Sequence, residues 1–181
     1  ATALTFNMHT SSMLWSGPLA DDLPMDDAER KRHHKRRGDI YAGVIDAGHI
    51  FAQPFSEPNS AAAAGKAPFG TEAEPVSGGY LVNGRKHFAS LSGHADFYGV
   101  LCTLAGEDKP TVRNTVYLAV DGKAPGFSVS GDWDVLGMRG TVSNNLVFDQ
   151  VFVPTEREML PTGMYFQAAK DWPHMFMTLC P

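Results

Sequence analysis

The middle of the chain, from about residue 51 to 154, alternates short apolar runs with turn signals, and this pattern most restricts the fold. The runs are a few residues long and rich in Val, Tyr and Phe, as β-strands are. Asn83-Gly84, Pro125-Gly126 and the Ser-Gly-Gly at 77–79 separate them. Many short strands without helical patterns between them predict an antiparallel barrel or sandwich.

The expected strands follow from the limits of these runs. They lie near 50–54, 72–76, 80–82, 85–89, 97–104, 115–120, 127–130 and 146–153. Asn83-Gly84 would then close a two-residue hairpin between the third and the fourth. Beyond Phe88 the chain continues with the small and hydroxyl-bearing residues 89–93, which are too small and polar to fill a core. They indicate either a loop or a group that packs closely against the backbone.

Both ends of the chain have a helical texture. Residues 1–49 carry apolar residues at helical spacing, and Asp26-Asp27 resembles a helix start ahead of a long cationic segment. Residues 164–181 are helical in pattern again, interrupted at Pro173. The predicted class is therefore α+β, with a β-rich region over about 51–154 between two helical parts. Because the chain starts without Met and stops within an apolar stretch, we interpret it as a fragment of a longer protein.

Composition argues against several kinds of protein. With 43% hydrophobic residues the 181-residue chain is globular, and its apolar runs are far shorter than the roughly 20 residues of a membrane helix. Two cysteines provide no disulfide framework, which favours the cytoplasm. The seven histidines lack metal-ligand spacing, so no metal is expected. The basic run 30–37 is interpreted as a solvated helix face, and since the rest of the chain is acidic, no nucleic-acid binding is expected.

Familiar catalytic and nucleotide-binding motifs are incomplete. Gly65-Lys66 matches the end of a phosphate-binding loop, but Ser60 replaces its first glycine and Ala67 its metal-binding hydroxyl. The sequence contains neither G-x-G-x-x-G nor G-x-S-x-G. Asp132 and Asp134 are better explained as loop-capping carboxylates than as a glycosidase pair.

Two segments remain as candidates for a binding site. Residues 53–60 and 86–93 each place an aromatic ring beside a serine at the end of a predicted strand. Where two such loops meet at one rim of a β-domain, hydroxyl and backbone N–H groups suit the polar edge of a planar heterocycle, and an aromatic ring can cover its face. Two ordinary loops capped by serine explain the same residues equally well.

Six segments, in order, resemble the middle domain of the acyl-CoA dehydrogenases. They are FSEPNS, GGYLVNGRKHFAS, HADFYGVL, LAVDGKAPGFSV, LGMRGT and LVFDQVFVP. The family reads T-E-P, G-x-x-x-N-G-x-K-x-W-I-T, A-D, P-G, L-G-x-R and F-x-x-V-x-V-P at these places. The resemblance covers about residues 50–163. It identifies residues 1–49 as the end of the family's N-terminal helical domain and 164–181 as the start of its C-terminal helical domain.

The resemblance implies FAD, held between the β-domain and the helical domains. The cofactor-binding residues that it implies are Gln53, Phe55, Ser56, Phe88, Ala89 and Ser90. Phe88, Ala89 and Ser90 take the places of W-I-T, which lies against the flavin in the family. Ser56 takes the Thr position of T-E-P, facing the pyrimidine edge, whereas Gln53 and Phe55 would contribute backbone contacts. Donors at these places stabilise the charge that develops when a flavin accepts hydride.

The loop after the T-E-P match departs from the family. There the family has G-A-G-S-D, whose Ser lies near the flavin pyrophosphate and the acyl-CoA; Ala62 stands in its place, and Ser60 is the hydroxyl able to substitute for it. These two residues are the candidate substrate-binding positions. Glu57 and Arg139 match a structural carboxylate and an arginine that anchors a turn. The family's catalytic base, a glutamate of the C-terminal domain, is expected outside this chain.

The activity that the resemblance implies is α,β-dehydrogenation of an acyl-CoA thioester in fatty acid metabolism. Electrons would pass to an electron-transfer flavoprotein, and the enzyme would be a homo-oligomer. A flavin-dependent monooxygenase on the same fold is the alternative, which the altered loop and the Phe-Ala-Ser segment leave open. A third possibility, without flavin, is a β-domain that binds a partner or scaffolds an oligomer.

Overall fold

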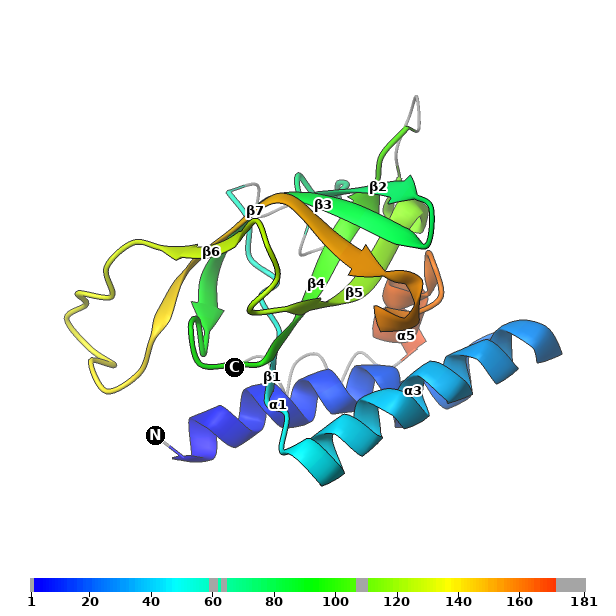
Figure 1. Ribbon diagram of the computed structural model, residues 1–181, viewed down its shortest axis with the longest axis horizontal. Coiled ribbons are helices and arrows are strands. Elements are labelled where there is room, and N and C mark those ends of the chain that lie inside the picture. Colours follow the sequence, from blue (N-terminus) through cyan, green and yellow to red (C-terminus); the bar gives the residue numbers. More distant parts are fainter. Residues whose placement is uncertain (1, 59–61, 63–64, 107–110, 172–181) are drawn as a thin grey trace.

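A twisted β-sheet with helices along one side of it makes up the fold (Figure 1). The computed structural model describes residues 2–58, 62, 65–106 and 111–171. The helical elements are α1 (Thr2–Ser16), α2 (Pro18–Asp21), α3 (Asp27–Ala47), the 3₁₀ turns η1 (Val112–Asn114) and η2 (Thr155–Arg157), and α5 (Met164–Asp171). The strands are β1 (Phe51–Ala52), β2 (Glu72–Val76), β3 (Gly79–Ser90), β4 (Phe97–Leu104), β5 (Thr115–Asp121), β6 (Phe127–Ser130), β7 (Ser143–Pro154) and β8 (Glu158–Leu160).

Helix α3 begins where the sequence predicts. The Asp26 side chain caps the helix by accepting a hydrogen bond from the Glu29 N–H at 2.8 Å, and the helix ends at Gly48, which has a left-handed backbone. The basic run lies on α3, and its residues are mostly exposed or half-buried. Arg36 nevertheless forms an ion pair with Glu158 of β8, and Arg37 with Asp21. The run therefore combines a solvated face with contacts that attach α3 to its neighbours.

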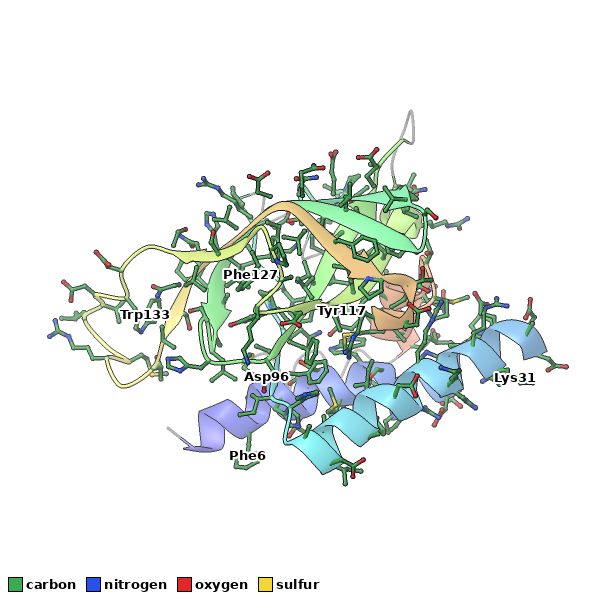
Figure 2. All side chains as sticks on the ribbon, viewed as in Figure 1. Phe6, Lys31, Asp96, Tyr117, Phe127 and Trp133 are labelled. Atoms are coloured by element: carbon green, nitrogen blue, oxygen red, sulfur yellow. The ribbon has the colours of Figure 1, made fainter. Side chains whose placement is uncertain are left out.

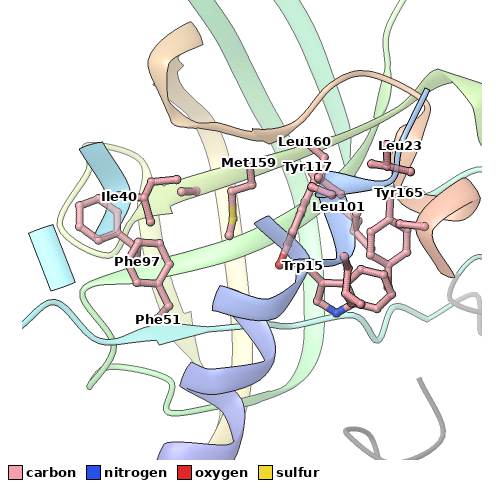
Figure 3. Close-up of a cluster of buried hydrophobic side chains, with 14 of the residues drawn as sticks. Trp15, Leu23, Ile40, Phe51, Phe97, Leu101, Tyr117, Met159, Leu160 and Tyr165 are labelled. Atoms are coloured by element: carbon pink, nitrogen blue, oxygen red, sulfur yellow. The ribbon is translucent and has the colours of Figure 1, made fainter. Parts of the chain in front are cut away.

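The helices are joined to the sheet by polar and apolar contacts. The backbone N–H of Phe51 donates to His9 Nδ1 of α1 at 3.1 Å, and Tyr41 of α3 donates to the Met13 carbonyl at 3.0 Å. Figure 3 shows a core between helices and sheet in which Trp15 and Tyr165 lie 4.8 Å apart, ring centre to ring centre. Burying such rings supplies much of the stability of a small fold.

A second core is formed mainly by residues of the sheet. Its largest members are Tyr98, Leu118, Leu146 and Phe148. Strand β5 contributes to both cores, because Val116, Leu118 and Val120 face this one while Tyr117 and Ala119 face the helices. This is why β5 is apolar at nearly every position.

The sheet topology differs from the predicted antiparallel barrel or sandwich. The strands form one sheet in the order β6-β7-β3-β2-β4-β5-β8, with β1 paired to β4, and in the part of the chain that the structure describes this path stays open. The β1–β4 and β2–β4 pairs are parallel. Strand β4 pairs with β2 and not with β3, the strand before it, so β2 and β4 run in the same direction. Apolar runs indicate strands but do not specify their partners.

The predicted hairpin at Asn83-Gly84 is wrong, because β3 continues through this dipeptide as one strand. The hairpin between β2 and β3 turns at Ser77-Gly78 instead. Asn83 Oδ1 accepts a hydrogen bond from the N–H of Gln150, at a bulge in β7. Gly84 has φ +139°, and a Cβ there would lie 2.7 Å from Thr71 Cα. The dipeptide thus marks a bulge and a close backbone approach.

The remaining expectations concern the C-terminal part. The sequence did not predict β8, whose three residues are too short to show a pattern. Helix α5 confirms the helical pattern after residue 163, whereas Pro173 lies outside the described residues. None of the helices in the described part of the chain is both long enough and apolar enough to cross a membrane.

Candidate functional site

A cavity of about 910 Å³ opens between α1, the segment after β1, the end of β3 and the loop 131–142 between β6 and β7. Figure 2 shows Trp133 on this loop, which extends away from the sheet. Residues from all four segments line the cavity, including Met8, Gln53, Phe55, Ser56, Phe88, Ser90, His94, Trp133, Met138, Arg139 and Ser143. The two candidate segments of the sequence therefore do meet in one place.

The structure places the sequence-predicted residues as follows. Those that line the cavity are Gln53, Phe55, Ser56, Phe88 and Ser90. Ala89 lies behind the wall, fully buried in the sheet core. Ala62 is fully buried in the core between helices and sheet and is not part of the lining, and Ser60 lies outside the described residues. The side-chain amide nitrogen and oxygen of Gln53 are buried and have no hydrogen-bond partner among the described residues.

A bulge in β3 presents Phe88 and Ser90 to the cavity. Val82 and Lys86 point into the protein, and simple alternation would turn Phe88 inward as well. The register against β7 shifts between Lys86 and Ala89, which inserts one extra residue in β3. As a result Ala89 is buried, while Phe88 is 69% exposed and has φ +50°. A positive φ on a bulky residue is strained and persists only where its surroundings hold it.

Hydrogen bonds fix this strand end to the neighbouring segments. The N–H of His87 donates to the Ser56 carbonyl at 2.8 Å, which ties β3 to the segment after β1. The hydroxyls of Ser90 and Ser143 lie 3.2 Å apart, and Ser92 Oγ accepts from the Asn144 N–H at 2.8 Å. At this side of the cavity, hydrogen bonds therefore link strands β3 and β7 and the segment after β1 to one another.

The residues next to the His87–Ser56 hydrogen bond in sequence, Lys86 and Glu57, form a buried ion pair. The Lys86 ammonium lies 2.5 Å from Glu57 Oε1, and both side chains are almost completely buried. Burial raises the pKa of Glu57, but the charge of Lys86 and hydrogen bonds from Lys86, Thr71 and Gly70 outweigh it, so that this pKa lies below its usual value. Glu57 therefore has the structural role that the sequence predicts.

The loop 131–142 supplies the outer wall. Trp133 Nε1 donates to the Met138 carbonyl at 3.3 Å, and Arg139 Nε donates to the Val135 carbonyl at 2.8 Å, as expected for an arginine that anchors a turn. Asp134 lies 3.7 Å from Arg139 and Asp132 is exposed, so both carboxylates belong to the loop. Among the described residues that line the cavity, the ionisable side chains are those of His94 and Arg139, and none is a carboxylate. In a chain of net charge −5, this wall suits a neutral or anionic ligand.

Sequence reasoning missed several of the lining residues. Asn7 and Met8 come from α1, where no pattern could show that they face a cavity. His94, Trp133 and Met138 lie in or beside matched segments that were given no role in binding. The described residues contain no group of three or more metal-ligating side chains.

Comparison with known proteins gives consistent results. Residues 52–151 match the family model described as the acyl-CoA dehydrogenase middle domain. A mitochondrial 2-methylacyl-CoA dehydrogenase of Solanum tuberosum is 34% identical over 123 residues, which are 66% of this chain and 28% of that protein. The oxygenase subunit HsaA of a flavin-dependent monooxygenase from Rhodococcus jostii is 34% identical over 91 residues, 50% of this chain and 22% of that one.

A solved structure has the same fold. A glutaryl-CoA dehydrogenase from Mycobacterium smegmatis, in complex with FADH2, superposes with a TM-score of 0.62 at 19% identity, over 86% of this chain and 35% of that chain. The chain spans less than a third of the length of the two curated relatives above. Since the family model matches more than half of the chain, the chain belongs to the acyl-CoA dehydrogenase family and contains its middle domain.

Proposed function

We propose that the protein containing this chain is an FAD-dependent acyl-CoA dehydrogenase, which introduces an α,β double bond into an acyl-CoA thioester. The observation that carries the proposal is the convergence of Ser56, Phe88 and Ser90 on one cavity. These residues belong to two segments far apart in the sequence that match flavin-contacting motifs of the family, and they line the same cavity. The FADH2 complex of the related fold supports the choice of cofactor.

The residues of the cavity fit a flavin. Phe88 offers an exposed aromatic face, and the hydroxyls of Ser56 and Ser90 offer polar contacts to the edge of a ring. The lining residues that the structure describes include no carboxylate that would repel the negative charge of the phosphates. FAD supplies an acceptor for hydride when bound. Ser56 and Ser90, as donors, would stabilise the negative charge that accompanies this transfer.

The rest of the reaction depends on parts of the protein beyond this chain. We propose that a glutamate outside residues 1–181 removes the α-proton. Residues 1–49, 50–163 and 164–181 would belong to the N-terminal helical, middle and C-terminal helical domains. We propose Ser60 as the hydroxyl that approaches the substrate, because it is the hydroxyl nearest in sequence to the position that Ala62 occupies. An electron-transfer flavoprotein as acceptor, a homo-oligomeric state and a cytoplasmic location complete the proposal; the scarcity of cysteines supports the last.

An anaerobic titration of the intact protein with acyl-CoAs of different chain length tests this function. We expect bound FAD whose visible absorbance bleaches on adding at least one acyl-CoA. Ser90→Ala should slow this bleaching markedly and lower the melting temperature only slightly, by the loss of its hydroxyl contact with Ser143. Bound flavin that remains oxidised with every thioester would contradict dehydrogenation.

A flavin-dependent monooxygenase is the second candidate, favoured by the similarity to HsaA. Such an enzyme would consume O₂ when given reduced flavin and an aromatic substrate, and its flavin would not respond to acyl-CoA. Oxygen uptake measured beside the acyl-CoA titration separates the two activities. A protein that binds flavin in neither experiment would instead support a β-domain without flavin that binds a partner or scaffolds an oligomer.

A further inference from the structure

Four segments of the chain meet at the buried ion pair between Glu57 and Lys86. The Glu57 carboxylate accepts hydrogen bonds from the Gly70 N–H at 2.6 Å, from the Thr71 N–H at 3.0 Å and from the Thr71 hydroxyl at 2.6 Å. The Lys86 ammonium also donates to the Leu101 carbonyl of β4 at 2.6 Å. The segment after β1, the approach to β2, and strands β3 and β4 are thus all attached to one pair of charges.

The pair is adjacent in sequence to the cavity wall on both sides. Glu57 directly follows Ser56, and Lys86 directly precedes His87, whose N–H bonds to the Ser56 carbonyl. The bulge that exposes Phe88 starts immediately after Lys86. Neither Glu57 nor Lys86 lines the cavity, so they can affect a ligand only through these neighbours.

We propose that Glu57 and Lys86 are positioning residues, which hold Ser56, Phe88 and Ser90 in the arrangement that a flavin requires. The positive φ of Phe88 is unfavourable by itself, and a strained backbone is kept only by contacts that over-determine it. The ion pair anchors the residue before the bulge to the interior while the His87 hydrogen bond anchors the bulge itself. Loss of either charge leaves the other buried without an opposite charge, although its remaining hydrogen bonds persist, and we expect the wall to rearrange.

The chain offers a matched control for loss of stability. Arg36 and Glu158 form a second partly buried ion pair, which joins α3 to β8. Neither residue lines the cavity, and the one printed hydrogen bond from β3 to this pair, from the Tyr80 hydroxyl to Glu158 at 3.3 Å, lies at the opposite end of the strand from the bulge. Arg36→Met therefore weakens the fold without disturbing the wall, whereas Glu57→Gln and Lys86→Met disturb both.

Amide hydrogen exchange of the intact protein without added cofactor tests the positioning role directly. We expect the His87 amide to exchange at least about tenfold faster in Glu57→Gln and in Lys86→Met, because opening of its bond to Ser56 becomes easier. In Arg36→Met this amide should exchange at the wild-type rate. The inference is overturned by an unchanged His87 rate in the Glu57 and Lys86 variants, or by an equal acceleration in the Arg36 control. The double variant Glu57→Gln/Lys86→Met, which leaves no buried charge, serves if a single variant does not fold.

If the ion pair holds the wall in place for a flavin, its loss should weaken FAD binding. This second experiment rests on the proposed function, because it assumes that the cavity binds FAD. At a temperature where all variants are folded, Glu57→Gln should bind FAD at least about tenfold more weakly and with an altered visible spectrum, while Arg36→Met binds like the wild type. Wild-type affinity in Glu57→Gln would refute the positioning role with the proposed function intact. A wild-type protein that binds no FAD would refute the proposed function, and the exchange experiment would still decide whether the ion pair positions the wall.

Discussion

Phe88 is the residue on which the shape of the candidate site depends most. Its ring reaches the cavity only because its backbone has φ +50°, in a region that disfavours residues with a Cβ. The side chain is 69% exposed, so it gains little from burial that could offset this strain. The interactions that offset this backbone strain are therefore those of its buried neighbours in the strand, Lys86 and Ala89.

Replacing Phe88 separates strain from ligand contact. Phe88→Gly should keep or raise the free energy of unfolding, by up to about 1 kcal/mol, since glycine accepts a positive φ. Phe88→Val should lower it by about 1–2 kcal/mol, because a β-branched residue is poorly accommodated there. Urea unfolding measures both. Both variants should bind FAD more weakly, and a Gly variant less stable than the Val variant would show that Phe88 is unstrained in solution.

Glu57 gives the fold a specific response to acid. Its pKa is below the usual 4.5 in the folded state, despite burial, because Lys86 and three hydrogen bonds favour the charged form. A carboxyl group whose pKa falls on folding contributes stability that is complete above its unfolded pKa. That contribution is lost as the pH falls through the lower, folded value.

The melting temperature as a function of pH measures this contribution. The wild type should lose stability below about pH 4.5 more steeply than Glu57→Gln, which has no group to protonate at this position. Just above pH 5 the variant should be less stable than the wild type, because Lys86 is then buried without its opposite charge. Parallel curves for the two proteins over the acidic range would contradict the assignment of a lowered pKa to Glu57.

Strand β3 is the element that connects fold and site, and its two irregularities have opposite consequences. At Asn83-Gly84 the extra residue lies in β7, so the side chains of β3 keep their faces. After Lys86 the extra residue lies in β3 itself, and the faces exchange. The sequence showed two strands here and a turn between them. Since Asn-Gly is common in tight turns and also suits a bulge, local chemistry alone could not distinguish the two.

Gly84→Ala tests the close approach at the first irregularity. A Cβ at this position would lie 2.7 Å from Thr71 Cα, and φ is +139°. The free energy of unfolding should fall by about 2 kcal/mol or more, as for other strained or overpacked sites. Gly38→Ala on α3 is the control, because a Cβ there meets nothing within 4 Å and should raise it by about 0.5–1 kcal/mol. Calorimetry on both variants would contradict the account if the two shifts had the same sign.

For the molecule as a whole, the sequence predicted most of the elements and the content of the site, but not their arrangement. The strands near 72–76, 97–104 and 127–130 agree with β2, β4 and β6, and the helix start at Asp26 is confirmed. Parallel pairing of β1 and β2 with β4 was not predictable, because partners far apart in sequence leave no local signal. For the same reason the side chains that α1 contributes to the cavity were missed.

The motif resemblance related residues that are far apart in the sequence, which the periodicity of apolar residues cannot do. It implies a flavin-binding role for both Ser56 and Ser90, which lie far apart in the sequence, and both line the same cavity. Their proposed role at the flavin depends on this shared location. The central claim is therefore that this cavity holds FAD through Ser56 and Ser90.

The most direct measurement is a titration of the intact apoprotein with FAD, followed by flavin fluorescence, in the wild type and in Ser56→Ala/Ser90→Ala. The control is Ser128→Ala, which removes an exposed hydroxyl of β6. The account predicts binding by the wild type and the control, and about 10- to 100-fold weaker binding by the double variant, from the loss of two hydrogen bonds. Equal FAD affinity of the double variant and the wild type, or no binding by the wild type, would contradict it.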